Sequence, residues 1–353
     1  MVESGESGES SGRGGLIKSE EVKNKSLYFL LAVVIVGVTG LFIFGISDKE
    51  DSDRDYRGAF RRNYMIFTPE LPEKADFAGE KVPLDDILVR ESFDREILAF
   101  TFMHSTTQQM FKRAHRYFHI IEPILKRYQV PDDFKFLAIA ESNLGNATSP
   151  AGAEGVWQFL TSTGRKYGLE INNEIDERYN LIKATEAACK YLLEAHDSFG
   201  DWTLAAASYN RGMGGMERAL KDQKVKSYYD LYLNEETARY VFRILAAKEI
   251  YENPTKYGFY LKDTDFYPPI TTYTIVVDST IENLPAFAKK QGLTYRIIRE
   301  FNPWIHGYSL PNKSRRTYIL TLPEKDALSV SSYMNRKASE TFFHDTLKIN
   351  EIH

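Results

Sequence analysis

Apolar residues recur along most of this chain at intervals of three and four, which is the spacing of one face of an α-helix. Breakers such as Val130-Pro131 and Gly200-Asp201 divide this pattern into separate segments. The segments cover residues 92–103, 109–128, 132–142, 181–199, 203–209, 214–221 and 235–253. We therefore expect a mainly α protein, with an all-α domain over residues 84–260.

The periodicity changes after Pro268-Pro269. Residues 271–277 alternate Tyr, Ile and Val as a strand does, and residues 317–322 do the same. Between them, residues 281–291 and 295–301 suit two short helices. The order strand, helix, helix, strand predicts a small α+β domain over residues 268–323.

A third pattern marks the N-terminal region. Leu27 to Ile46 contains twenty residues without a charge, and a helix of that length spans roughly 30 Å, the thickness of a bilayer core. The alternative is a cleaved signal peptide, but its apolar region is shorter and ends in a small-x-small site. Lys18, Lys23 and Lys25 precede the span and an acidic stretch follows it, so we expect a cytoplasmic N-terminus and export of the rest.

The remaining segments lack a periodic apolar pattern. Residues 1–26 begin with Gly, Ser and Glu repeats and are expected to form a disordered cytoplasmic tail. Residues 47–83 are charged and interrupted by proline, which predicts a linker, and residues 324–353 are expected to form a polar C-terminal tail.

Composition excludes several classes of function. A formal net charge of -4 argues against a nucleic-acid partner. The single cysteine, Cys189, cannot form an internal disulfide and is expected to be a small core residue. His115 and His119 have a metal-ligand spacing on a helix, but the HExxH glutamate is missing. We expect neither a metal nor another cofactor.

One carboxyl stands out chemically. The run from Phe134 to Ala140 is apolar except for Lys135, and Glu141 continues its apolar face at helical spacing. A carboxyl there loses hydration, which raises its pKa, as a general acid near neutral pH requires. The alternative is that Glu141 ends a core helix and points into water. The helix-poor stretch from 143 to 155 is expected to be a functional loop.

Five short motifs follow one another across about 100 residues. They are Glu141-Ser142-Asn143, Ser149-Pro150-Ala151-Gly152-Ala153, Gly155-Val156-Trp157-Gln158, Ala206-Ala207-Ser208-Tyr209-Asn210-Arg211-Gly212 and Glu236-Thr237-x-x-Tyr240. Together they resemble the lytic transglycosylase domain related to goose-type lysozyme. The Trp-Gln pair, the run from Asp201 to Ala207 and the membrane segment are most similar to the membrane-bound murein transglycosylase D-like branch.

The resemblance implies a lysozyme-like fold and a function. It makes Glu141 the single general acid and base that cleaves the MurNAc-GlcNAc β-1,4 bond of peptidoglycan without hydrolysis, leaving 1,6-anhydro-muramic ends. It implies a substrate-binding cleft formed by Ser149, Trp157, Gln158, Tyr209, Asn210, Glu236 and Tyr240. The chain departs from the family pattern at Gly145, Ser208 and Trp157, which affects subsites rather than the reaction.

The C-terminal βααβ pattern resembles a LysM module, a binder of cell-wall glycans. Asp278-Ser279-Thr280 stands near its usual Gly-Asp-Thr turn, and Phe301-Asn302-Pro303 resembles its Leu-Asn-Pro. From Pro268 to Pro323 there are seven Lys and Arg against three acids. This excess suits an anionic wall, although a solvated face has the same composition.

Two other functions stay open. A muramidase using water needs a second carboxylate, for which Glu154 is the candidate, and a catalytically silent scaffold would only bind the wall. The main expectation is a single-pass protein of the bacterial inner membrane, anchored by Leu27–Ile46, with a periplasmic catalytic domain acting on peptidoglycan glycan strands. No protein partner is indicated.

Overall fold

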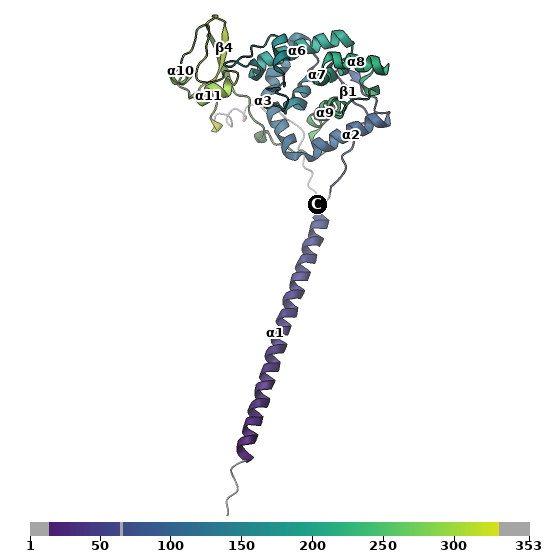
Figure 1. Cartoon of the computed structure of the whole chain (residues 1–353), viewed down its shortest axis with the longest axis vertical. Helices are drawn as coiled ribbons and strands as arrows, with labels where there is room; N and C mark the ends of the chain where they lie inside the picture. Colours follow the sequence, from purple (N-terminus) through teal and green to yellow (C-terminus); the bar gives the residue numbers. More distant parts are fainter. Residues whose placement is uncertain (1–13, 64–65, 332–353) are drawn as a thin grey trace, which may run out of the picture. The chain divides into compact units, whose positions relative to one another are not determined.

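The computed structural model describes residues 14–63 and 66–331, which fall into two compact units that divide between Thr68 and Pro69 (Figure 1). Residues 1–13 and 332–353, which belong to the tails predicted at 1–26 and 324–353, lie outside the described residues. The first unit consists of one long helix, and the second contains all of the remaining elements.

The first unit is helix α1, which runs from Gly14–Asn63 over 50 residues. It includes an apolar stretch, Asn24–Phe42, with a mean hydropathy of 2.0 and no buried side chains. This stretch is long and apolar enough to cross a membrane, although a signal sequence has the same properties. The helix continues for 21 residues beyond Phe42, about 30 Å, because no proline interrupts the chain before Pro69. Residues 14–26 and 47–63 are therefore helical, where the sequence predicted a disordered tail and a linker.

The second half of the predicted linker also has structure. Strand β1 (Asp76–Phe77) pairs antiparallel with β2 (Glu80–Lys81). Phe77 is fully buried and meets Phe134 edge to face, with 5.1 Å between the ring centroids. The folded part therefore begins before the predicted boundary at residue 84, because this hairpin belongs to the core.

The helical domain follows the predicted pattern closely. Its helices are α2 (Ile87–Phe102), α3 (His104–Tyr128), α4 (Lys135–Ser142), α5 (Thr161–Lys166), α6 (Leu181–Phe199), α7 (Trp202–Arg211), α8 (Met213–Gln223) and α9 (Glu235–Glu252). Short 3-10 turns lie at Asp132–Phe134, Glu177–Tyr179, Tyr228–Asp230, Pro254–Tyr257 and Asp263–Asp265. The mainly α fold class is confirmed, and α5 is the helix that the sequence pattern missed.

Helix boundaries follow local capping chemistry. Asp86 accepts hydrogen bonds from the backbone of Leu88 and Val89 at the start of α2, and Asp201 accepts one from Leu204 at the start of α7. Helix α6 ends at Gly200, whose φ of 66° suits glycine. These caps fix where α7 starts, and hence where its C-terminal residues lie.

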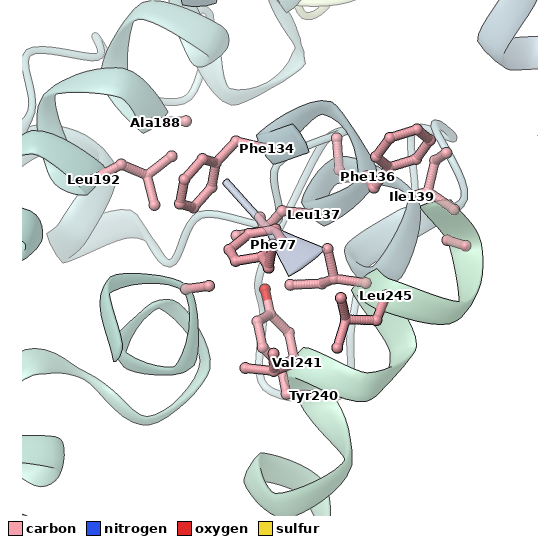
Figure 2. Packing of buried hydrophobic residues seen from close by; sticks show 14 of the residues in the cluster. Phe77, Phe134, Phe136, Leu137, Ile139, Ala188, Leu192, Tyr240, Val241 and Leu245 are labelled. Carbon is pink, nitrogen blue, oxygen red and sulfur yellow. The ribbon is translucent and has the colours of Figure 1, made fainter. Parts of the chain in front are cut away.

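Helix α9 is the centre of the domain. It packs against α2, α4 and α7, while α6 packs against α3 and α7. Figure 2 shows Tyr240, Val241 and Leu245 of α9 meeting the apolar face of α4 that contains Leu137. Burial of these side chains fixes α4 against α9, and so fixes the position of Glu141 relative to Tyr240.

The C-terminal domain has the predicted βααβ order: β3 (Thr272–Val277), α10 (Leu284–Lys290), α11 (Tyr295–Phe301) and β4 (Tyr318–Pro323). The strands are antiparallel, with Thr272 opposite Pro323 and Val277 opposite Tyr318. Its core includes Trp304 and also Ile175, a residue of the helical domain that is 2% exposed.

The two domains are joined by backbone contacts as well as by this shared core. Ile175 forms an isolated antiparallel bridge with Ile305. The amide of Asp176 donates to the carbonyl of Trp304 at 2.8 Å, and the amide of His306 donates to the carbonyl of Glu174 at 2.7 Å. The C-terminal domain is therefore docked on the segment of the helical domain that precedes α6.

Candidate active site

Glu141 lies in the last turn of α4, immediately before the helix stops. Asn143 and Leu144 follow with φ values of 50° and 57°, so the chain turns sharply into a loop. Leu144 is buried, and the Asn143 side-chain amide donates to the carbonyl of Thr106 at 3.0 Å. These anchors fix the position at which α4 ends and the loop begins, one residue or two after Glu141.

The carboxyl of Glu141 is partly buried and faces α9. Its Oε1 accepts a hydrogen bond from the hydroxyl of Tyr240. Burial raises the pKa of Glu141 from an ordinary value of 4.5 to about 7; the Tyr240 hydrogen bond and the charge of Arg243 oppose this, and the charge of Glu236 adds to it. Near neutral pH both protonation states are populated, so the group can give a proton and take one back.

Two tyrosines surround this carboxyl, and neither ionises near neutral pH. Burial and the charge of Glu141 raise the pKa of Tyr240 well above 10, which keeps its hydroxyl a donor. Tyr209 has a similarly raised pKa for the same two reasons. Its hydroxyl donates to the carbonyl of Trp157 at 2.8 Å, and this contact ties α7 to the loop after α4.

The loop holds its own shape with two of the predicted site residues. The Ser149 Oγ accepts from the amide of Ala153 at 2.9 Å. The Gln158 Nε2 donates to the carbonyls of Ala147 and Gly155 at 2.8 and 2.7 Å. Both side chains therefore use these atoms to order the loop.

Trp157 does not line a cleft. Its side chain is fully buried, and its Nε1 donates to the Thr185 hydroxyl on α6 at 2.8 Å. The predicted contact of Trp157 with substrate is therefore corrected to a core role, because a side chain without exposed surface cannot touch a glycan. A buried indole meets its need for a hydrogen-bond partner inside the protein, as it does here.

Asn210 and Glu236 meet where α7 ends and α9 begins. The Asn210 Nδ2 donates to Glu236 Oε1 at 3.1 Å, and its Oδ1 accepts from the Thr237 hydroxyl at 2.8 Å. Glu236 is exposed, and Tyr240 lies one helical turn further along α9. The structure thus brings Asn210, Glu236, Tyr240 and Glu141 into one neighbourhood.

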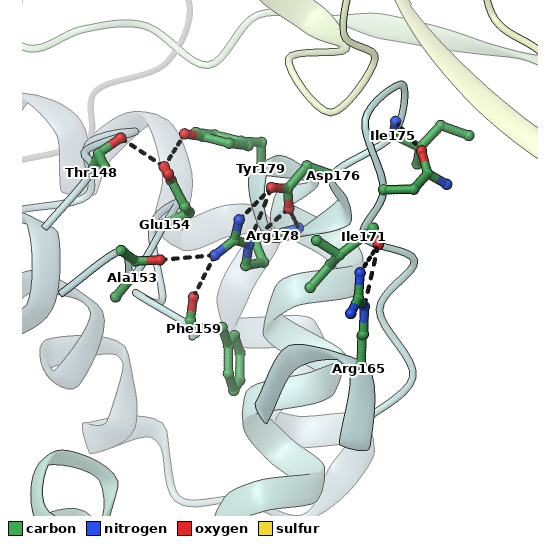
Figure 3. A network of polar contacts seen from close by, with 12 residues as sticks. Thr148, Ala153, Glu154, Phe159, Arg165, Ile171, Ile175, Asp176, Arg178 and Tyr179 are labelled. Carbon is green, nitrogen blue, oxygen red and sulfur yellow. Dashed lines mark hydrogen bonds and ion pairs between the residues drawn. The ribbon is translucent and has the colours of Figure 1, made fainter. Parts of the chain in front are cut away.

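Glu154, the candidate second carboxylate, belongs to a different network. Its Oε2 accepts from the Thr148 hydroxyl at 2.7 Å and from the hydroxyl of Tyr179 (Figure 3). Residue 154 also forms backbone bridges with Thr148 and Phe159. Its carboxylate is thus engaged in holding the loop.

Three residues that support the site were not among the predicted site residues. Thr185 and Thr237 are buried and bind Trp157 and Asn210, and Arg178 is a buried cation beside the loop. Thr237 lies inside the last motif, but its role depends on the approach of α7. Only the three-dimensional arrangement identifies these partners.

A polar pocket of about 490 Å³ lies elsewhere, between the helical and C-terminal domains. Its lining includes Glu170, Lys183, Arg316 and Tyr318. Glu170 accepts from Arg316 at 2.8 Å and from Tyr318 at 3.0 Å across the domain boundary. The pocket therefore marks the domain junction, and Glu141 is not part of its lining.

Two domain families match the chain. Residues 118–232 match the transglycosylase SLT domain, and residues 273–326 match the soluble lytic transglycosylase C-terminal LysM-like domain. Both resemblances predicted from the motifs are confirmed by these matches.

Individual relatives agree with the domain matches. The chain is 31% identical over 260 residues to membrane-bound lytic murein transglycosylase D of Escherichia coli K12, covering 71% of this chain and 56% of that protein. The protein of the same name from Escherichia coli O6:H1 gives the same values. A putative tributyltin chloride resistance protein of Alteromonas sp. M-1 is 29% identical over 117 residues, 33% of this chain and 56% of that protein. The chain spans about half the length of the curated relatives it matches.

Proposed function

We infer that this chain, which carries a transglycosylase SLT domain and a LysM-like domain, is a lytic transglycosylase that cleaves the MurNAc-GlcNAc β-1,4 bond of peptidoglycan. The observation that carries the proposal is the state of Glu141. Its pKa is raised to about 7 by burial, and Tyr240 orients it. A single carboxyl that is both acid and base near neutral pH matches a reaction with one general acid and base.

The reaction proceeds in two proton transfers. Glu141 first donates its proton to the glycosidic oxygen as the bond to C1 of the muramoyl sugar breaks. The resulting carboxylate then takes the proton of the C6 hydroxyl of the same sugar as that oxygen bonds to C1. The product is a 1,6-anhydro end, Glu141 regains its proton, and no water is consumed.

An internal nucleophile explains why one carboxyl suffices. A hydroxyl of the same sugar has a high effective molarity, so no second carboxylate is required to activate it. Hydrolysis would require a second carboxyl on the other face of the sugar or beside it. Glu154 is bound by the hydroxyls of Thr148 and Tyr179, which favours the transglycosylase over the muramidase.

The other side chains have three roles in this proposal. Asn210 and Glu236 contact the sugar chain from the exposed side of the site, together with Tyr209. Ser149 and Gln158 set the shape of the loop that borders the sugar, while Tyr240 holds the acid. The raised pKa of Glu141 also speaks against a silent scaffold, since a protein that only binds the wall does not use a proton donor.

The decisive experiment is mass spectrometry of the muropeptides that the full chain in detergent releases from purified sacculi. Products lighter than the hydrolytic ones by one water are expected, and Glu141→Gln should abolish their release. Glu91→Gln, which removes an exposed carboxyl on α2, is the matched control and should release them normally. Reducing ends that disappear in Glu154→Gln would identify a muramidase instead.

We further propose that α1 anchors the enzyme in the inner membrane, with its N-terminus in the cytoplasm and residues 69–331 in the periplasm. The apolar stretch Asn24–Phe42 supports the anchor, and the lysines before it support the orientation. The single cysteine, Cys189, is buried, and burial raises its pKa to about 12, so it does not compete in thiol labelling.

Labelling with a membrane-impermeant maleimide tests this orientation. In spheroplasts, Tyr56→Cys should react, because Tyr56 is 72% exposed and follows the span, whereas Ser4→Cys should react only after lysis. The reverse pattern would refute the orientation, and loss of the N-terminus from the mature protein would identify a signal peptide.

A further inference from the structure

A buried ion pair lies between the LysM-like domain and the loop that follows α4. The Arg178 Nη2 lies 2.6 Å from the Asp176 Oδ2, and the Arg178 Nε donates to the Asp176 Oδ1 at 2.9 Å. The two side chains are only 7% and 6% exposed. A pair this far from water is costly unless its remaining donors find partners, so those partners indicate what the pair does.

The remaining donors of Arg178 bind the loop at two points. Its Nη1 donates to the carbonyl of Gly152 at 3.0 Å. The same Nη1 donates to the carbonyl of Phe159 at 3.1 Å (Figure 3). The next residue, Tyr179, donates its hydroxyl to Glu154 of the same loop. The segment around Arg178 therefore holds both ends and the middle of the stretch from 152 to 159.

The loop also approaches this segment at backbone level. Gly155 has a φ of 77°, and a Cβ placed there would lie 2.0 Å from the carbonyl oxygen of Arg178. Only glycine permits such a close approach. Loop and segment are thus in direct contact, so a shift of the segment moves the loop.

The same segment is bound on its other side by the LysM-like domain. The amide of Asp176 donates to the carbonyl of Trp304 at 2.8 Å. Ile175 is buried in the core of that domain, and Glu174 accepts from the amide of His306 at 2.7 Å. Residues 174–179 are therefore shared between the LysM-like domain and the loop.

We propose that Arg178 is a positioning residue and that the LysM-like domain, through residues 174–179, holds the loop at Glu141 in its working shape. This inference rests on the proposed function. The loop supplies Gln158 and the Trp157 carbonyl that binds the Tyr209 hydroxyl, so its position sets the wall of the site. A displacement of about 1 Å in such a wall can cost on the order of 100-fold in rate.

This role differs from binding the wall. A domain that only binds glycan raises the local concentration of enzyme on sacculi and leaves turnover of a short soluble fragment unchanged. A domain that holds the loop changes kcat on any substrate, including a peptidoglycan tetrasaccharide too short to reach beyond the site. Turnover of the tetrasaccharide therefore separates the two roles.

The test uses the full chain in detergent with this tetrasaccharide. Arg178→Lys keeps a cation beside Asp176 but cannot reach both loop carbonyls, so kcat should fall about 10- to 100-fold while KM changes little. Ile175→Ser, which weakens docking without touching the loop, should lower kcat in the same direction. Arg296→Gln is the matched control: its guanidinium is exposed and lies 3.9 Å from Glu300 within the same helix, α11, so it holds neither the loop nor residues 174–179, and kcat should equal that of the unmodified chain.

Amide hydrogen exchange provides a second readout that needs no activity. The amides of Ser149, Glu154 and Gly155 are hydrogen-bonded within the loop, and in Ile175→Ser they should exchange about tenfold faster or more. Unchanged exchange and unchanged kcat in folded Arg178→Lys and Ile175→Ser would overturn the proposal, as would a loss confined to sacculi. An unmodified chain that yields reducing ends would overturn the proposed function, while the exchange measurement still decides the role of the LysM-like domain.

Discussion

Replacing Glu141 by glutamine should stabilise the protein at high pH and not at low pH. In the unfolded chain this carboxyl ionises near its ordinary value of 4.5, whereas in the folded protein burial holds its pKa at about 7. Between these values the folded state binds more protons than the unfolded state, so unfolding becomes easier as the pH rises. Stability linked to Glu141 is therefore fully present below pH 4.5 and lost as the pH rises through about 7.

The magnitude follows from the distance between the two pKa values. A difference between 4.5 and about 7 corresponds to about 3 kcal/mol, since each pH unit is worth about 1.4 kcal/mol. Glutamine has nearly the same shape, still accepts from Tyr240 and does not ionise. Relative to the unmodified chain, Glu141→Gln should thus gain about 3 kcal/mol in free energy of unfolding between pH 4 and pH 8.

Urea unfolding followed by tryptophan fluorescence measures this difference, because all three tryptophans lie in the unit that begins at Pro69. Ser142→Ala is the matched control. It removes the neighbouring hydroxyl, which donates to the carbonyl of Val156 at 2.8 Å, and its cost should be the same at both pH values. A difference between Glu141→Gln and the unmodified chain that does not change with pH would refute the raised pKa, and with it the assignment of Glu141 as the acid.

Three further substitutions, the last of them with a control, test single contacts. Tyr240→Phe removes a hydrogen bond that favours the charged form of Glu141, which raises the pKa of this carboxyl. The pH above which kcat/KM falls should therefore rise by about 1 unit, and a shift of that pH to a lower value contradicts the reasoning. Trp157→Phe should cost about 2 kcal/mol of stability while KM stays unchanged, because the side chain is buried. A raised KM would show instead that Trp157 contacts the substrate. Gly155→Ala should lower the free energy of unfolding by about 2–4 kcal/mol and remove most of the activity. Gly152→Ala places its new Cβ with nothing within 4 Å and should lower the free energy of unfolding by only about 1 kcal/mol. Thermal unfolding measures both values.

The sequence predicted the structure best where one local pattern determines both the secondary structure and the burial of a segment. The apolar run before Glu141 predicted both a buried helix and a carboxyl with a raised pKa. The same residues show the helical spacing and provide the apolar side chains that are buried. The βααβ order after Pro268 was equally readable, since each element carries its own period. By contrast, β1 and β2 have two residues each, too few for any period, so the burial of Phe77 could not be foreseen.

The site was less predictable, because a motif gives residue types and not their surroundings. Trp157 and Gln158 are adjacent in one motif, yet Trp157 is buried in the core and the Gln158 side chain is hydrogen-bonded to the loop backbone. Their different roles depend on Thr185 and Ala147, which approach from other parts of the chain. Contacts of this kind are set by packing, which no single stretch of sequence contains.

The shared segment at residues 174–179 also limits how these two domains can be exchanged by recombination. By sequence alone, a crossover in the connection between Pro254–Tyr257 and β3 should leave both domains intact, because it falls between the last turn of one domain and the first strand of the other. It would nevertheless separate the LysM-like domain from Ile175, which completes its core, and leave that side chain exposed on the helical domain. Gene fusions that keep both domains stable must therefore inherit residues 174–179 together with the C-terminal domain, so the two domains form one heritable unit.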